Sequence, residues 1–115
     1  LTRKIRRGLY HGMQVDMWIA DENNVVTMVQ FVNGSGWFNG ATRSVAKRNG
    51  MKLSQLGLWR DEELLVGPMM KYDYQTILNQ EQEIFDALGL NHIPLNERSA
   101  MDSREAFWII NKNRK

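Results

Sequence analysis

The chain has 115 residues, of which 43% are hydrophobic, and its 15 Lys and Arg residues nearly balance 13 Asp and Glu residues. This length and apolar content suffice for one small folded domain and argue against disorder. The sequence has no cysteine, which excludes disulfides and thiolate metal sites and fits a reducing compartment.

No apolar run approaches the roughly 20 residues that a membrane-spanning helix needs. We therefore expect no membrane partner and an intracellular location, cytoplasmic or nucleoid-associated. The sequence starts at Leu1 rather than Met, and this start favours a domain cut from a longer protein.

The first predicted element is an antiparallel β-hairpin over residues 13–32. Residues 13–20 alternate loosely between apolar and polar side chains, residues 21–24 are typical of a turn, and residues 25–32 are rich in β-branched side chains. Ahead of the hairpin lies a basic cluster, either a solvated chain end or an arm that faces nucleic acid: Arg3, Lys4, Arg6 and Arg7.

A glycine-rich turn then leads into a predicted helix over about residues 37–48. Apolar side chains recur there every four residues, and Asn49-Gly50 suits a left-handed helix end. A glycine-rich turn that opens a helix brings backbone N–H groups toward a ligand and suits phosphate. Asn39 and Arg43 lie four residues apart, so we expect both to face one cleft and to contact base edges and phosphates.

The charged residues are unevenly distributed. Acids gather at residues 61–63 and 81–86, whereas four cations follow the glycine-rich turn: Arg43, Lys47, Arg48 and Lys52. Such a bipolar surface offers one face to a polyanion, although ordinary solvated charges explain it equally well.

The rest of the chain predicts short elements. Residues 52–59 and 63–66 are expected to pair as strands, residues 75–79 to form a helical turn, and residues 81–88 a helix that ends at Gly89. The last predicted helix covers residues 102–111, with an N-terminal capping box in which Asp102 is the cap and Glu105 the third helical residue. The expected fold class is α+β: a β-hairpin followed by small helices and short strands.

Three segments in order resemble the C-terminal part of family X DNA polymerases, the group that includes DNA polymerase beta. They are Gln-Val-Asp-Met-Trp-Ile (14–19), Phe-Val-Asn-Gly-Ser-Gly-Trp-Phe-Asn-Gly-Ala-Thr-Arg (31–43) and the segment 81–98, which contains Ala-Leu-Gly-Leu and Pro-Leu-Asn-Glu-Arg. The resemblance covers about residues 10–98. It implies last palm-type strands in residues 1–32 and a thumb-type, nucleotide-selecting subdomain in residues 33–98. Residues 99–115 are a C-terminal extension, expected to be helical.

The resemblance implies that Asp16 is a catalytic residue and a ligand of Mg²⁺, as the third metal-binding aspartate of the family. The Gly-Ser and Asp-x-Asp pattern that supplies the other two carboxylates is absent from this sequence. We therefore expect the chain alone to be inactive and to need the remainder of a polymerase, in cis or in trans. Without the family context, an exposed residue of a hairpin is the better explanation of Asp16.

The resemblance also implies a binding surface for the incoming dNTP and the template-primer DNA. The implied nucleotide-binding residues are Phe31, Gly34, Ser35 and Asn39, and the implied DNA-binding residues are Arg43, Lys47 and Arg48. In relatives the Gly34–Ser35 type of peptide is cis. Gly36, Gly40 and Gln14 depart from the family pattern, because larger polar or charged residues are usual at these positions.

The expected function is thus part of a nucleotidyltransferase of DNA repair or replication. The alternative is a stand-alone, non-catalytic DNA-binding or regulatory module with a polymerase-like fold. A small protein-interaction domain is a third interpretation.

Overall fold

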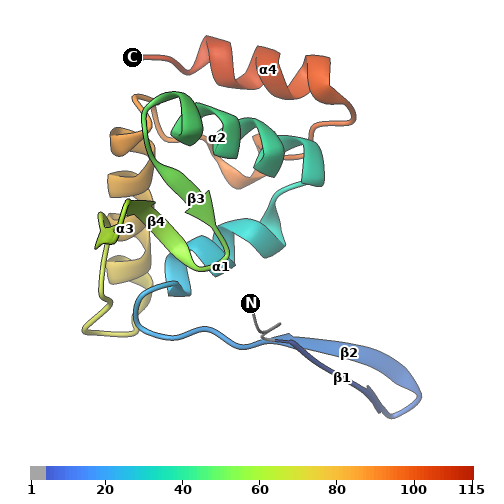
Figure 1. Ribbon diagram of the computed structural model, residues 1–115. Helices are drawn as coiled ribbons and strands as arrows, with labels where there is room; N and C mark the ends of the chain where they lie inside the picture. The colour runs from blue at the N-terminus through green and yellow to red at the C-terminus, as the bar shows by residue number, and fades with distance from the viewer. Residues whose placement is uncertain (1–4) are drawn as a thin grey trace.

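The computed structural model describes the backbone of residues 5–115 and the side chains from residue 7 onward. Arg3, Lys4 and the side chain of Arg6, part of the predicted basic cluster, therefore lie outside the described residues. Two small antiparallel sheets and four α-helices form an α+β fold (Figure 1), as the sequence predicted.

A two-stranded hairpin opens the fold and projects from the body of the molecule (Figure 1). Strand β1 (Ile5–Tyr10) pairs with strand β2 (Met13–Trp18), and Arg7 lies opposite Asp16. His11 and Gly12 both have positive φ angles, of 49° and 79°, which suits a tight two-residue hairpin turn. The predicted first strand is confirmed at β2, but its partner is β1 rather than residues 25–32.

Residues 25–32 form helix α1 (Val25–Asn33), so the prediction of a strand there is wrong. The preference of Val and Thr for strands is weak and yields to tertiary context. The context here is a firmly held helix start: the buried Asn24 accepts a hydrogen bond from the Asp21 N–H at 2.7 Å and donates one to the Gln55 carbonyl at 2.8 Å. The side chains of Val26 and Met28 are buried.

Helix α2 (Gly36–Arg48) confirms the predicted helix. The side-chain oxygen of Ser35 caps its first turn, and Gly50, with φ of 75°, follows the C-cap residue Asn49. A three-stranded sheet comes next, formed by β3 (Lys52–Ser54), β4 (Gly57–Arg60) and β5 (Glu63–Leu64). The segments predicted to be strands do pair, but residues 52–59 supply two strands rather than one.

Helix α3 (Tyr74–Ala87) merges the predicted turn at 75–79 and helix at 81–88 into one helix, which Gly89 ends with φ of 73°. After the short 3-10 turn η1 (Leu95–Glu97) comes helix α4 (Ser103–Lys112). Asp102 accepts a hydrogen bond from the Glu105 N–H at 2.8 Å, which confirms the predicted cap. Within the extension beyond residue 99, residues 103–112 are helical.

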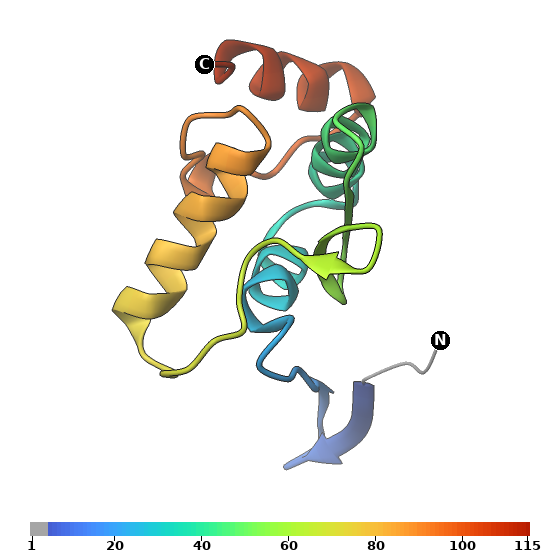
Figure 2. The ribbon, with the colours of Figure 1, turned by 60° about the vertical axis from the view of Figure 1, so that its left-hand side comes forward.

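One core holds the four helices together. It includes Phe38 and Val45 of α2, Ile84 and Phe85 of α3, and Ile110 of α4. Figure 2 shows α3 along one side of the body, and Figure 1 shows α4 lying along α2. Ser103 lies beside Gly36, and Arg114 and Lys115 lie beside Arg48, so α2 and α4 run in the same direction.

Candidate nucleic-acid interface

Phe31, Asn39 and Arg43 line one small hollow of about 20 Å³ where α1, α2 and β3 meet. We call it the Asn39–Arg43 hollow; its other lining residues are Thr27, Gln30, Thr42, Leu53 and Ser54. The predicted meeting of Asn39 and Arg43 in one cleft is therefore seen. The one-turn spacing places both on the same side of α2.

Arg43 lies over an aromatic platform. Its guanidinium carbon is 5.6 Å from the centre of the Phe31 ring, and the ring of Trp18 meets Phe31 edge-on at 5.2 Å between centroids. No salt bridge joins Arg43 to a residue in the described part of the chain. The half-buried cation is thus held by a ring and free of a carboxylate, and this arrangement leaves its charge available to an anion.

The side chain of Asn39 is fixed by backbone contacts. Its amide nitrogen donates to the Phe31 carbonyl at 3.0 Å and to the Gly34 carbonyl at 3.4 Å. The second contact is long for a hydrogen bond, so that N–H is the one more easily released to a ligand. A Cβ atom placed on Gly34 would lie 2.5 Å from the Asn39 Oδ1 atom, so a larger residue at this position would displace the Asn39 side chain.

The Gly34–Ser35 turn is anchored from a distant segment. The Ser35 N–H donates to the Arg98 carbonyl at 3.0 Å, while the Ser35 hydroxyl accepts from the Phe38 N–H at 3.2 Å. The cis peptide among residues 5–115 is Gly67–Pro68, so the Gly34–Ser35 peptide is trans and the expected cis bond is wrong. A trans bond avoids the roughly 3 kcal/mol that a non-proline cis bond costs, and both backbone anchors form with it.

A buried ion pair supports this anchor and was missed by the sequence reasoning. The Arg98 guanidinium donates to both carboxylate oxygens of Glu81, at 3.0 and 2.8 Å, and its Nε donates to the Ile93 carbonyl at 2.8 Å. His92 lies 2.8 Å from the same carboxylate. Burial acts to raise the pKa of Glu81, but the hydrogen bonds of Arg98 and His92 outweigh it and hold this pKa below its usual value.

The pair escaped prediction because the sequence shows Glu81 only as one of the acids at residues 81–86 and Arg98 only as the last residue of the segment 81–98, 17 positions away. The available signal was an arginine three residues after an Ile-Pro-Leu run, too common a pattern to indicate burial.

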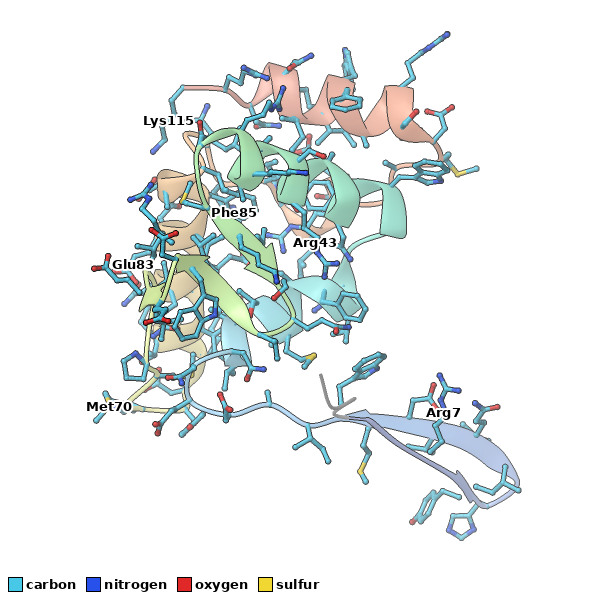
Figure 3. All side chains as sticks on the ribbon, in the orientation of Figure 1. Arg7, Arg43, Met70, Glu83, Phe85 and Lys115 are labelled. Carbon is cyan, nitrogen blue, oxygen red and sulfur yellow. The ribbon has the colours of Figure 1, made fainter. Side chains whose placement is uncertain are left out.

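Asp16 stays apart from the Asn39–Arg43 hollow. It lies on the projecting hairpin, 3.5 Å from the Arg7 guanidinium and 3.4 Å from the Gln14 amide, and more than a third of its side chain is exposed. Figure 3 shows Arg7 on the hairpin, away from Arg43 on α2. The contact between Trp18 and Phe31 joins the two regions.

The residues present do not complete a metal site. Within residues 5–115, no three His, Cys, Asp or Glu side chains gather closely enough to hold a metal ion. Mg²⁺ is bound in proteins by several oxygen ligands, and Asp16 offers a single carboxylate beside an arginine.

Lys47 and Arg48 lie on different sides of α2. Lys47 lies one turn beyond Arg43 and is exposed. Arg48 instead lines a cavity of about 370 Å³ at the other side of the helix, together with Arg114 and Lys115. The structure therefore groups Lys47, but not Arg48, with Arg43.

Comparison with known protein families identifies the family of this chain. Residues 28–99, more than half of the chain, match the family described as DNA polymerase beta thumb. The chain belongs to the DNA polymerase beta thumb family. No curated protein matches the chain.

The polymerase beta thumb assignment covers α1 from Met28 through η1 and therefore includes the Asn39–Arg43 hollow. The hairpin and α4 lie outside residues 28–99, and the domain boundaries at residues 32 and 98 stay predictions. Among the helices of residues 5–115, none is long and apolar enough to cross a membrane.

Proposed function

We propose that this chain is the nucleotide-selecting and DNA-binding part of a family X polymerase. The surface around the Asn39–Arg43 hollow would face the nascent base pair: Asn39 contacts the incoming dNTP, Arg43 the template strand, and Lys47 a neighbouring phosphate. The observation that carries this proposal is the pairing of a fixed amide with an arginine that has no carboxylate partner within the described residues.

The charge of α2 supports the proposal. The helix has no acidic residue, while Arg43, Lys47 and Arg48 are all in its second half. Cations on a helix that carries no carboxylate produce a local positive potential, which attracts phosphate even where the net charge of the whole chain is only +2.

For Asp16 we propose only a part of a metal site. Its carboxylate would contribute one ligand to a Mg²⁺ site whose other carboxylates come from the remainder of the polymerase. The Arg7 contact at 3.5 Å is loose and exposed, so it would give way to a metal at small cost. When bound, the ion would supply electrostatic activation of the reacting oxygens.

The test is binding of the chain to a labelled primer-template duplex, followed by fluorescence anisotropy over a range of salt concentrations. Arg43→Ala is expected to weaken binding about 5- to 10-fold and to reduce the salt slope by about one. Arg60→Ala is the matched control, because Arg60 is an exposed arginine of β4 outside the hollow. Equal losses for both variants, or none for Arg43→Ala, would contradict the proposal.

A stand-alone DNA-binding module is the second candidate. It is favoured by the incomplete metal site within the described part of the chain. Duplex binding that Mg²⁺ and a matched dNTP leave unchanged would select this candidate. Tighter binding with the dNTP that base-pairs with the template, compared with a mismatched one, would select the polymerase role.

A further inference from the structure

A basic cavity lies where the end of α2, the end of α3 and the chain after α4 meet. Its volume is about 370 Å³, within the range of roughly 300–1,000 Å³ typical of small-ligand pockets. Its cations are Arg48, Arg114 and Lys115. Arg114 and Lys115 lie outside residues 28–99, so the match to the thumb family does not cover this cavity as a whole.

The lining of the basic cavity contains these three cations and no carboxylate side chain. Arg48 and Arg114 form no salt bridge with a described residue, whereas Lys115 pairs with Asp86 of α3. The Arg114 Nε atom donates to the side-chain oxygen of Asn111 at 3.1 Å, a bond that orients the guanidinium without using its two terminal nitrogens. The cavity therefore presents positive groups that an anion can bind.

Backbone contacts bring these cations together from distant parts of the sequence. Leu90 and Arg114 form an isolated antiparallel bridge, and the Lys115 N–H donates to the Gly89 carbonyl at 3.0 Å. These bonds fix the chain after α4 beside the segment that follows α3. Cations that share one cavity repel one another, and an anion bound among them removes this repulsion. The fold thus holds the cations in place before a ligand arrives.

The rest of the lining favours a small ligand over a nucleic-acid strand. The apolar part of the lining consists of the buried side chains of Val45, Leu88 and Leu90. No aromatic ring lines the cavity, so a base would find no surface for stacking. Glu83 and Asp86 are exposed on the last turns of α3, and these acids would repel a strand that continued past the cavity.

We propose that the basic cavity binds the polyphosphate group of a small ligand and recognises it by charge rather than by a base. The guanidinium groups of Arg48 and Arg114 donate to the phosphate oxygens. Lys115 joins them, because its exposed pair with Asp86 is weak enough to exchange. This inference goes beyond the proposed function and does not depend on it: Figure 3 shows Lys115 apart from Arg43.

The first experiment locates the site with inorganic tripolyphosphate as the probe. The full chain, labelled with nitrogen-15, is titrated in metal-free buffer at low salt and followed by the chemical shifts of its amides. The largest changes are expected at residues 88–90 and 113–115. Largest changes at residues 39–43 would place the anion in the Asn39–Arg43 hollow and overturn the inference.

Calorimetric titration of variants tests the cations. Arg48→Gln and Arg114→Gln should each weaken tripolyphosphate binding roughly 5- to 10-fold, the effect of losing a charge-assisted hydrogen bond. Arg104→Gln is the matched control, because Arg104 is an exposed arginine of α4 outside the cavity lining. All three arginines are exposed, so each variant should keep the melting temperature of the free protein. Equal losses for the three variants would indicate unspecific attraction and overturn the inference.

Inorganic phosphate tests whether more than one phosphate group is bound. It should bind at least about 10-fold more weakly than tripolyphosphate, since a single group reaches fewer of the cations. Equal affinities would overturn the assignment to a polyphosphate.

Binding of the blunt duplex separates this inference from a strand-binding role and from the proposed function. Arg114→Gln should lose tripolyphosphate affinity and keep duplex affinity at the level of Arg104→Gln; a selective loss of duplex affinity would assign the cavity to a DNA strand and overturn the inference. Duplex binding without tripolyphosphate binding also overturns it and leaves the proposed function standing. Tripolyphosphate binding that depends on Arg48 and Arg114, without any duplex binding, overturns the proposed function instead.

Discussion

Arg98 and Glu81 form a buried, two-pronged ion pair, and the main-chain carbonyl of Arg98 accepts a hydrogen bond from Ser35, at the turn that opens α2. The charges themselves are 17 residues apart in the sequence. The pair thus connects the middle of α3, where Glu81 lies, through Arg98 to the candidate nucleotide-binding turn. Replacing the Glu81–Arg98 pair is expected mainly to lower the free energy of unfolding and, to a smaller extent, to disturb the Gly34–Ser35 turn.

Arg98→Leu should lower the free energy of unfolding by about 3–5 kcal/mol, because it leaves the Glu81 carboxylate buried without its partner. Chemical denaturation followed by circular dichroism measures the change. Glu83→Gln is the control, since Glu83 is exposed on the same helix (Figure 3) and should have almost no effect. A double replacement, Glu81→Leu with Arg98→Leu, should be less destabilising than Arg98→Leu alone; an additive loss would argue against a coupled pair.

The pH dependence of stability should report the same carboxylate. The pKa of Glu81 is lowered in the folded state, so its contribution is fully present above the unfolded pKa of about 4.3 and is lost as the pH falls through the folded value. Glu81→Gln should therefore flatten the acid limb of a plot of unfolding free energy against pH. An acid limb identical to that of the wild type would show that other groups dominate it.

Gly34→Ala is expected to disturb Asn39 rather than the fold. The added methyl group would lie 2.5 Å from the Asn39 Oδ1 atom, and the side chain is the part able to move. Its two hydrogen bonds to the Phe31 and Gly34 carbonyls would then break. We expect weaker primer-template binding together with a small loss of stability, of about 1 kcal/mol.

Gly36→Ala is the comparison variant for this prediction, since its Cβ position is open. It should keep duplex affinity and raise the melting temperature slightly. Similar DNA affinities for the two variants would contradict the role given to Asn39.

Asp102→Ala should weaken the start of α4. The Asp102 carboxylate accepts the Glu105 N–H at 2.8 Å, and loss of such a cap typically costs about 1 kcal/mol. Hydrogen exchange of the α4 amides measures it, with the α3 amides as an internal reference. Equal acceleration in both helices would mean that α4 does not open on its own.

The sequence predicted most elements but not all of their partners. Helix α2 was predictable because its apolar repeat and its Asn49-Gly50 end agree. Helix α1 was not, since its Val-rich run favours a strand and the contact that fixes its start, from Asn24 to Gln55, spans 31 residues. Strand β1 was missed because a basic segment was interpreted by its charge and not by its alternation.

The candidate site was likewise predicted only in part. Asn39 and Arg43 were placed together correctly, because one helical turn fixes their relation whatever surrounds them. Arg48 was not separated from Lys47, although neighbouring residues on a helix point about 100° apart. The Glu81–Arg98 pair joins side chains from separate segments, and spacing within either segment carries no information about it.

The pairing of α4 with α2 has a consequence for truncation. Ala106, Ile109 and Ile110 bury one side of α4 in the core that also holds Ala41 and Val45 of α2. Two backbone hydrogen bonds hold the chain after α4 to the segment that follows α3. The Asn91 N–H donates to the Asn113 carbonyl at 2.8 Å, and the Lys115 N–H donates to the Gly89 carbonyl at 3.0 Å. A protein truncated after residue 99 would expose the apolar face of α2 to water and would tend to aggregate. The last sixteen residues therefore shield an apolar surface of the thumb from water.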